Sequence, residues 1–115
     1  MHEMGIVQSI MEIVEKQAEA NNAKKVVRIC LEFGLLTAVQ PDAIDFAFEI
    51  LSKGTVAEGA IMDVTIIPLK VYCIDCAKTQ VLESYQPFCP LCSTGTLQIV
   101  AGRDEMRISA IEIEE

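Results

Sequence analysis

The spacing of apolar residues predicts two amphipathic helices in the first half of the chain. Over residues 5–20 and again over residues 41–51, apolar side chains recur every three or four positions, which is the period of one helix face. Pro41 suits the first turn of a helix, and Asp42 suits the positive end of its dipole. The residues that set the two apolar faces are Ile6, Ile10, Val14, Ile44, Phe48 and Leu51.

Alternation of apolar and polar residues predicts strands in four other segments. Residues 25–36, 60–68, 97–101 and 105–114 carry the two-residue period of a strand with one buried face. In the last of these segments the period changes phase, because Ile111 and Ile113 fall on the face opposite to Ile108. A bulge near Ala110, or burial on both faces, would explain this change.

The segment between the second and third of these strands holds four cysteines in two close pairs. Cys73 and Cys76 form one C-x-x-C motif, and Cys89 and Cys92 form another. Two such turns can direct four thiolates at one point, which is the closed geometry of a structural zinc site. An iron–sulfur cluster or two disulfides are the alternatives. The fifth cysteine, Cys30, has no neighbouring ligand in the sequence and is interpreted as a small, partly buried thiol.

These elements together predict an α+β fold. We expect a small antiparallel sheet of about three strands covered by two helices, with an inserted zinc-ribbon-like module. Residues 1–69 and 96–115 would form the α/β domain, and residues 70–95 would form the zinc-binding domain inserted between strands. The inserted segment is polar and rich in turns, so we expect bound metal to supply much of its stability.

Charge and composition restrict the class of function. The formal net charge of −8 would be repelled by a phosphate backbone, so we expect no nucleic-acid partner. No apolar run is long enough to span a bilayer, and the first residues lack the pattern of a secretory signal, so we expect a cytoplasmic protein. With a single histidine near the terminus and no glycine-rich phosphate loop, we expect no enzyme.

The first three residues offer a second set of metal ligands. The Met1 α-amine, the deprotonated His2 amide nitrogen and the His2 imidazole can form two fused chelate rings in one plane. Planar nitrogen coordination favours Ni(II) or Cu(II) over zinc. The fourth position would come from the Glu3 carboxylate, another backbone nitrogen or a partner, and this open geometry suits transient binding. The alternative is that a residue this close to a terminus is frayed and has no role.

In combination, these motifs resemble the HypA/HybF family of nickel metallochaperones for hydrogenase maturation. The resemblance covers essentially the whole chain. It is carried by Met1-His2-Glu3, the VAEGA segment at residues 56–60, the two C-x-x-C pairs, the EMR segment at residues 105–107 and the IEI segment at residues 111–113.

The resemblance implies a nickel-binding α/β domain, a separate zinc domain, and transfer of Ni(II) to [NiFe]-hydrogenase. It implies two partners, an accessory GTPase of the HypB type and the hydrogenase large subunit, while some members also serve urease. It further implies that His2 binds nickel, that Met1 supplies its terminal amine and that Glu3 assists. The implied zinc ligands are Cys73, Cys76, Cys89 and Cys92.

This chain departs from the family in two places. Some members recruit an acidic residue near position 40, where this chain has Gln40, with Asp42 two residues on. Others use an additional histidine near the zinc module, which this chain lacks. We therefore expect a nickel metallochaperone whose nickel site is completed differently. The alternative is a zinc-ribbon protein-interaction module without nickel function, and the sequence fits a monomer or a homodimer.

Overall fold

The computed structural model describes residues 3–93 and 95–114 and divides into two compact units. The first unit contains the chain up to Glu32, Val39–Thr65 and the chain from Arg107 onwards. The second contains Phe33–Ala38 and Ile66–Met106. The domain boundaries expected near residues 70 and 95 stay a prediction.

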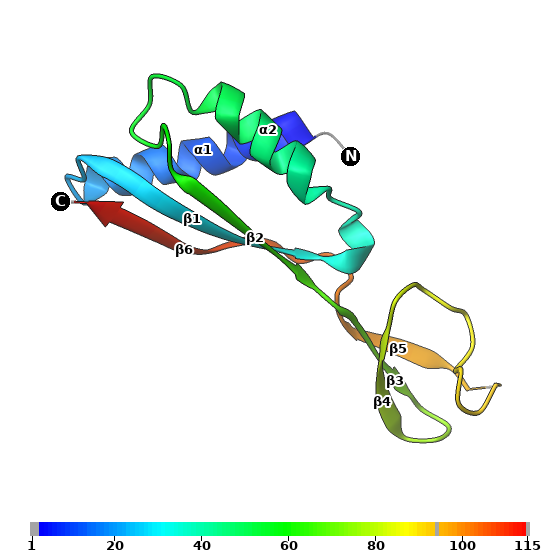
Figure 1. Ribbon diagram of the computed structural model, residues 1–115. Helices are drawn as coiled ribbons and strands as arrows, with labels where there is room; N and C mark the ends of the chain where they lie inside the picture. Colours follow the sequence, from blue (N-terminus) through cyan, green and yellow to red (C-terminus); the bar gives the residue numbers. More distant parts are fainter. Residues whose placement is uncertain (1–2, 94, 115) are drawn as a thin grey trace. The chain divides into compact units, whose positions relative to one another are not determined.

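The first unit combines two helices with a three-stranded sheet. Helices α1 (Glu3–Ala20) and α2 (Pro41–Leu51) lie on the same side of this sheet (Figure 1). The sheet has the strand order β2-β1-β6, formed by β2 (Ile61–Ile67), β1 (Lys25–Gly34) and β6 (Met106–Glu114). Both helices therefore have the extents that the apolar period predicts, within two residues at either end.

The core of the first unit lies between the helices and the central strand β1. The apolar stripes of the helices and the inner face of β1 are the most deeply buried parts of this unit. Pro41 is the first residue of α2. Proline lacks an N–H group, but at this position an N–H would have no partner within the helix, so no hydrogen bond is lost. The buried apolar residues of this unit are Val7, Ile10, Met11, Val14, Ala18, Val26, Ile29, Leu31, Val39, Ile44, Ala47, Phe48 and Ala57.

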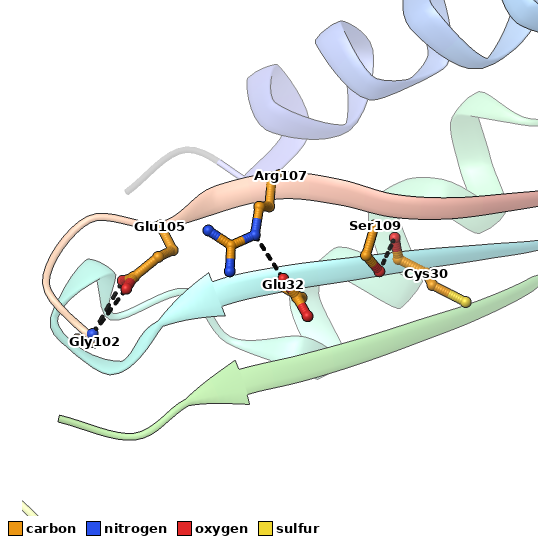
Figure 2. A network of polar contacts seen from close by, with 6 residues as sticks. All are labelled: Cys30, Glu32, Gly102, Glu105, Arg107 and Ser109. Atoms are coloured by element: carbon orange, nitrogen blue, oxygen red, sulfur yellow. Dashed lines mark hydrogen bonds and ion pairs between the residues drawn. The ribbon is translucent and has the colours of Figure 1, made fainter. Parts of the chain in front are cut away.

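The other face of the sheet carries polar side chains. Arg28 on β1 forms ion pairs with Asp63 on β2, at 3.1 Å, and with Glu112 on β6, at 3.4 Å. Figure 2 shows the neighbouring pair, in which Arg107 Nε of β6 donates to Glu32 Oε1 of β1 at 2.6 Å. The sheet is therefore apolar toward the helices and charged on its opposite face, as is usual where only one face is covered.

The second unit contains a sheet that the sequence pattern did not predict. Strands β3 (Leu69–Cys73), β4 (Lys78–Leu82) and β5 (Leu97–Ala101) pair antiparallel in the order β4-β3-β5. A strand was expected over residues 25–36, but β1 ends at Gly34 and a three-residue 3₁₀ turn, η1 (Leu35–Thr37), follows it. The small apolar core of this unit consists of Leu69, Val71 and Leu82, with Leu35, Leu97 and Ile99 packed against it.

Two short strands in the cysteine segment, β3 and β4, were missed. Strand β4 opens with three polar residues in succession and so lacks the two-residue period, and β3 ends inside the first C-x-x-C motif. The α+β class is nevertheless confirmed, with two helices, small antiparallel sheets and a cysteine module. Within the described residues, no helix is both long and apolar enough to cross a bilayer.

The phase change expected in the last strand is present in the burial of β6. Ile108, Ile111 and Ile113 are partly buried, whereas Met106 and Ala110 are exposed. The apolar side therefore shifts between Ile108 and Ile111, as the sequence predicts. A backbone bulge near Ala110 as its cause stays a prediction.

Candidate metal centre

The four paired cysteines meet at one point in the second unit. Cys73 ends β3, Cys76 lies in the turn that leads to β4, and Cys89 and Cys92 lie in the loop between β4 and β5. Their sulfur atoms all lie within 4.8 Å of one another. The Sγ atoms of Cys73 and Cys92 are 3.8 Å apart, and those of Cys76 and Cys89 are also 3.8 Å apart.

These distances fit a tetrahedral metal ion. A tetrahedron of thiolates with metal–sulfur bonds of about 2.3 Å has sulfur–sulfur edges of roughly 3.8 Å. A disulfide would need a separation of about 2.05 Å, and all five cysteines are free thiols in the structure. The arrangement could therefore hold one metal ion between the two C-x-x-C turns. Elsewhere in residues 3–93 and 95–114, no other group of three or more potential ligands of this kind converges.

Both C-x-x-C turns end in the same backbone conformation. Ala77 follows Cys76 with φ of 54°, and Ser93 follows Cys92 with φ of 67°. These left-handed residues change the direction of the chain directly after the second cysteine of each pair. The Ser93 N–H closes the second turn by donating to the Cys89 carbonyl at 2.8 Å.

Contacts from neighbouring segments hold the two turns together. The Ile74 N–H donates to the Thr96 carbonyl at 3.1 Å, and the Thr96 N–H donates to the Asp75 carboxylate at 3.3 Å. Residues inside the first cysteine turn thus bond to the chain just before β5. The geometry of the site depends on this link as well as on the sulfur atoms.

Gly95 is the residue of the cluster that sequence reasoning missed. A Cβ atom added to Gly95 would collide with the Cys73 sulfur and would lie 2.8 Å from the Cys92 sulfur. Its carbonyl accepts the Cys89 N–H at 3.3 Å. In the sequence, Gly95 is visible only as a glycine three residues after Cys92. The close approach of Gly95 to the sulfur atoms is a tertiary contact, which the spacing of a motif does not reveal.

Gln80 is a second unpredicted contributor, and it acts on one sulfur alone. It lies on β4, one of the missed strands, and its side-chain N–H donates to Cys89 Sγ at 3.3 Å. Hydrogen bonds from the Cys92 backbone, and then from Gln80, lower the pKa of the Cys89 thiol to about 6. A hydrogen bond with the Cys73 sulfur, together with burial, raises the pKa of the Cys76 thiol to about 12. The thiols of Cys89 and Cys76 thus differ in pKa in this geometry. A bound cation would favour the thiolate form of its ligands.

The predicted nickel ligands lie at the other end of the chain. Met1 and His2 lie outside the described residues, and Glu3 is the first residue of α1, where it is partly buried. Gln40 precedes α2 without capping it through its side chain, and Asp42 is exposed in the first turn of that helix.

Comparison with known proteins gives matches along the whole chain. The family model HypA, described as hydrogenase/urease nickel incorporation, metallochaperone, matches residues 1–113. The hydrogenase maturation factor HypA of Rhodobacter capsulatus is 43% identical over 98% of this chain and 99% of its own length. The hydrogenase maturation factor HybF of Escherichia coli is 36% identical over 99% of this chain and 100% of its own length.

Solved structures agree with these sequence matches. The solution structure of the Ni metallochaperone HypA from Helicobacter pylori has a TM-score of 0.65 and 26% identity, and covers 99% of this chain and 98% of that chain. A second solution structure of a HypA protein has a TM-score of 0.70 at 26% identity and covers 97% of this chain. With a family match from residue 1 to 113 and relatives similar over their full length, this chain belongs to the HypA family of nickel metallochaperones for hydrogenase maturation.

Proposed function

We propose that this protein binds Ni(II) at its N-terminus and delivers it during maturation of [NiFe]-hydrogenase. The observation that carries the proposal is the family match over residues 1–113, in a chain whose only histidine is His2. The proposed ligands are the Met1 amine, the His2 imidazole and amide nitrogen, and Glu3. The protein is a carrier and not an enzyme, as its membership of a metallochaperone family supports.

The start of α1 supports this ligand set. Helix α1 begins at Glu3, and the first N–H groups of a helix have no carbonyl four residues earlier to bond. A backbone nitrogen at or before this position can therefore lose its proton to a metal without breaking a helical hydrogen bond. A backbone nitrogen further along the helix would not be available to a metal, because its N–H bonds to the carbonyl four residues earlier.

We further propose that the cysteine cluster holds a structural zinc ion. Cys73, Cys76, Cys89 and Cys92 would supply four thiolates and leave no open position for substrate or exchange. Two of their sulfur–sulfur distances are 3.8 Å, and all four sulfur atoms lie within 4.8 Å of one another, which supports this assignment. Four free thiols suit a reducing compartment, so we place the protein in the cytoplasm.

The proposed partners are those that membership of the family implies. No glycine-rich phosphate loop is present in the sequence, so nucleotide hydrolysis would belong to an accessory GTPase of the HypB type. The recipient of nickel would be the hydrogenase large subunit. The description of the family also includes urease, so urease is the alternative recipient.

Nickel titration of the untagged protein beside its His2→Ala variant tests the proposal. Isothermal calorimetry of the zinc-loaded parent should give about one Ni(II) per chain, and His2→Ala should abolish that binding because the imidazole and its chelate ring are lost. Zinc content, measured by elemental analysis, should be unchanged in the variant.

A matched control is an extension by one residue before Met1. It keeps His2 but moves the free amine away from the chelate, so nickel binding should weaken strongly. A parent that binds no nickel would favour the alternative, a zinc-ribbon protein-interaction module. Undiminished binding by His2→Ala would place the nickel site elsewhere.

A further inference from the structure

Strand β5 is an edge strand of the second sheet, and its outer side is open (Figure 1). No strand in the described part of the chain pairs with β5 on the side away from β3. Just before β5 begins, the Ile74 N–H donates to the Thr96 carbonyl. Because backbone groups alternate in direction along an antiparallel strand, Gln98 also turns its N–H and C=O toward β3. Leu97 and Ile99 therefore turn theirs toward the open side, where no loop or turn backbone of the described residues bonds to them.

A groove follows this open edge. It has a volume of about 470 Å³ and is lined by Tyr85, Leu97, Gln98, Ile99, Val100 and Arg103. Successive side chains of a strand point to opposite faces of the sheet. A groove lined by four consecutive residues of β5 therefore lies along its edge and not over one face. A chain segment placed in this groove would meet backbone groups as well as side chains.

One face of the groove is apolar. Leu97 and Ile99 pack against the small core of the second unit, yet both remain partly exposed. Tyr85, from the loop after β4, lies in the same groove and is 58% exposed. Apolar side chains of an added strand, directly opposite Leu97 and Ile99, would extend the core outward. The other edge of the sheet offers no such row, because β4 opens with three polar residues.

Arg103 supplies charge complementarity for an acidic ligand. It follows β5 by two residues and is the only charged residue that lines the groove. Its side chain is exposed and forms no ion pair with any residue that the structure describes. A guanidinium can bond both oxygens of one carboxylate. A carboxylate is thus the group that fits this end of the groove.

A bulge limits the length of the segment that can pair with β5. The pairing skips Val100, which lies between the partners of Lys70 and Val71. An extra residue of this kind bends the strand and interrupts its edge. The regular part of the edge is therefore Leu97–Ile99. It suits a short extended segment better than a long strand from another sheet.

We propose that the edge of β5 binds a short extended segment of a partner protein. The segment runs antiparallel to β5, with two alternate apolar residues opposite Leu97 and Ile99 and a carboxylate on Arg103. Because β5 runs toward Arg103, an antiparallel segment begins at that end. Its acidic residue therefore precedes its apolar ones, in the order acidic, polar, apolar, polar, apolar. Backbone hydrogen bonds supply affinity, and the alternate side chains supply specificity.

Titration of the full-length, metal-loaded protein with a synthetic peptide tests the proposal. The peptide is Asp-Thr-Val-Thr-Val-Thr, acetylated and amidated at its ends. In ¹⁵N NMR spectra the amide resonances of Leu97 and Ile99 should shift, with a dissociation constant below about 1 mM. The same peptide with asparagine in place of aspartate should bind more weakly, because it brings no charge to Arg103.

Two N-methylated peptides test pairing through the backbone. Methylation of the valine nitrogens removes the N–H groups that face β5 and should abolish binding. Methylation of the threonine nitrogens removes N–H groups that face away from β5. That second peptide is the matched control and should bind within about threefold of the parent peptide.

A pair of charge variants tests the role of Arg103. Arg103→Glu turns an exposed attraction into a repulsion and should weaken binding of the aspartate peptide about fivefold. A peptide with lysine in place of aspartate should prefer this variant to the parent. Lys78→Glu makes the same change of charge on β4, at the other edge of the sheet, and should leave the affinity within about twofold. Circular dichroism and metal content check that each variant is folded.

Four outcomes would overturn the proposal. These are no shift at about 1 mM peptide, equal loss of binding with both N-methylated peptides, and shifts confined to β4. The fourth is a shift of the β5 amides with protein concentration alone, which would make a second copy of the chain the occupant. The protein used is free of nickel, so this result and that of the nickel titration are independent.

Discussion

Gly95 lies close enough to the cysteine cluster to affect a metal ion bound there. Its backbone lies against the Cys73 and Cys92 sulfur atoms, in space that a methyl group would need. Gly95→Ala should therefore push the two sulfur atoms apart and weaken zinc affinity at least about tenfold, a shift of about 1.4 kcal/mol or more. Competition with a chromophoric chelator measures this affinity.

The control for this change is Gly5→Ala in α1. A Cβ added to Gly5 meets no atom within 4 Å, and alanine is the better helix former. This variant should keep the zinc affinity of the parent. Equal affinities for the two variants would show that the approach of Gly95 to sulfur is not required.

Among the elements, β3 connects the apolar core of the second unit to its metal site. It is the central strand of the β4-β3-β5 sheet, it carries buried Leu69 and Val71, and it ends at Cys73. Packing of Val71 and the proposed ligation of zinc by Cys73 would thus constrain this five-residue strand at two points. Stability of the sheet and affinity for metal should be coupled through it.

Val71→Ala tests this coupling. Loss of two buried methyl groups should destabilise the zinc-bound unit by about 1–3 kcal/mol and speed the release of zinc to a chelator. Val81→Ala on β4 is the matched control, because Val81 is 66% exposed, and it should leave the release rate unchanged. Equal rates for the two variants would mean that the small core does not support the site.

At this scale the sequence predicted some elements and missed others for physical reasons. Helices α1 and α2 span several turns, so their apolar faces repeat often enough to be recognised. The four cysteines were identified because ligand spacing is local. Strands β3 and β4, together with the roles of Gln80 and Gly95, depend on contacts between distant residues, which no local period contains.

For the whole molecule, the two units differ in what stabilises them. The first unit buries two helix faces against a sheet, whereas the second has a core of three fully packed residues and a cysteine cluster. Removing zinc should therefore unfold the second unit and leave the first folded. Circular dichroism should retain its helical signal after chelation, while amide resonances of residues 66–106 should lose their dispersion. Loss of the helical signal, or retained dispersion, would contradict this division.

The packing of Leu35 bears on whether the cysteine segment can be separated from the rest of the chain. Leu35, from η1, lies against the core formed by Leu69, Val71 and Leu82, and Leu97 and Ile99 join it from β5. A fragment limited to residues 70–95 would keep all four paired cysteines but lose Leu35, Leu69, Leu97 and Ile99. The cysteine segment is thus not expected to fold on its own. If it were grafted into another protein, the apolar residues that pack against it would have to be included.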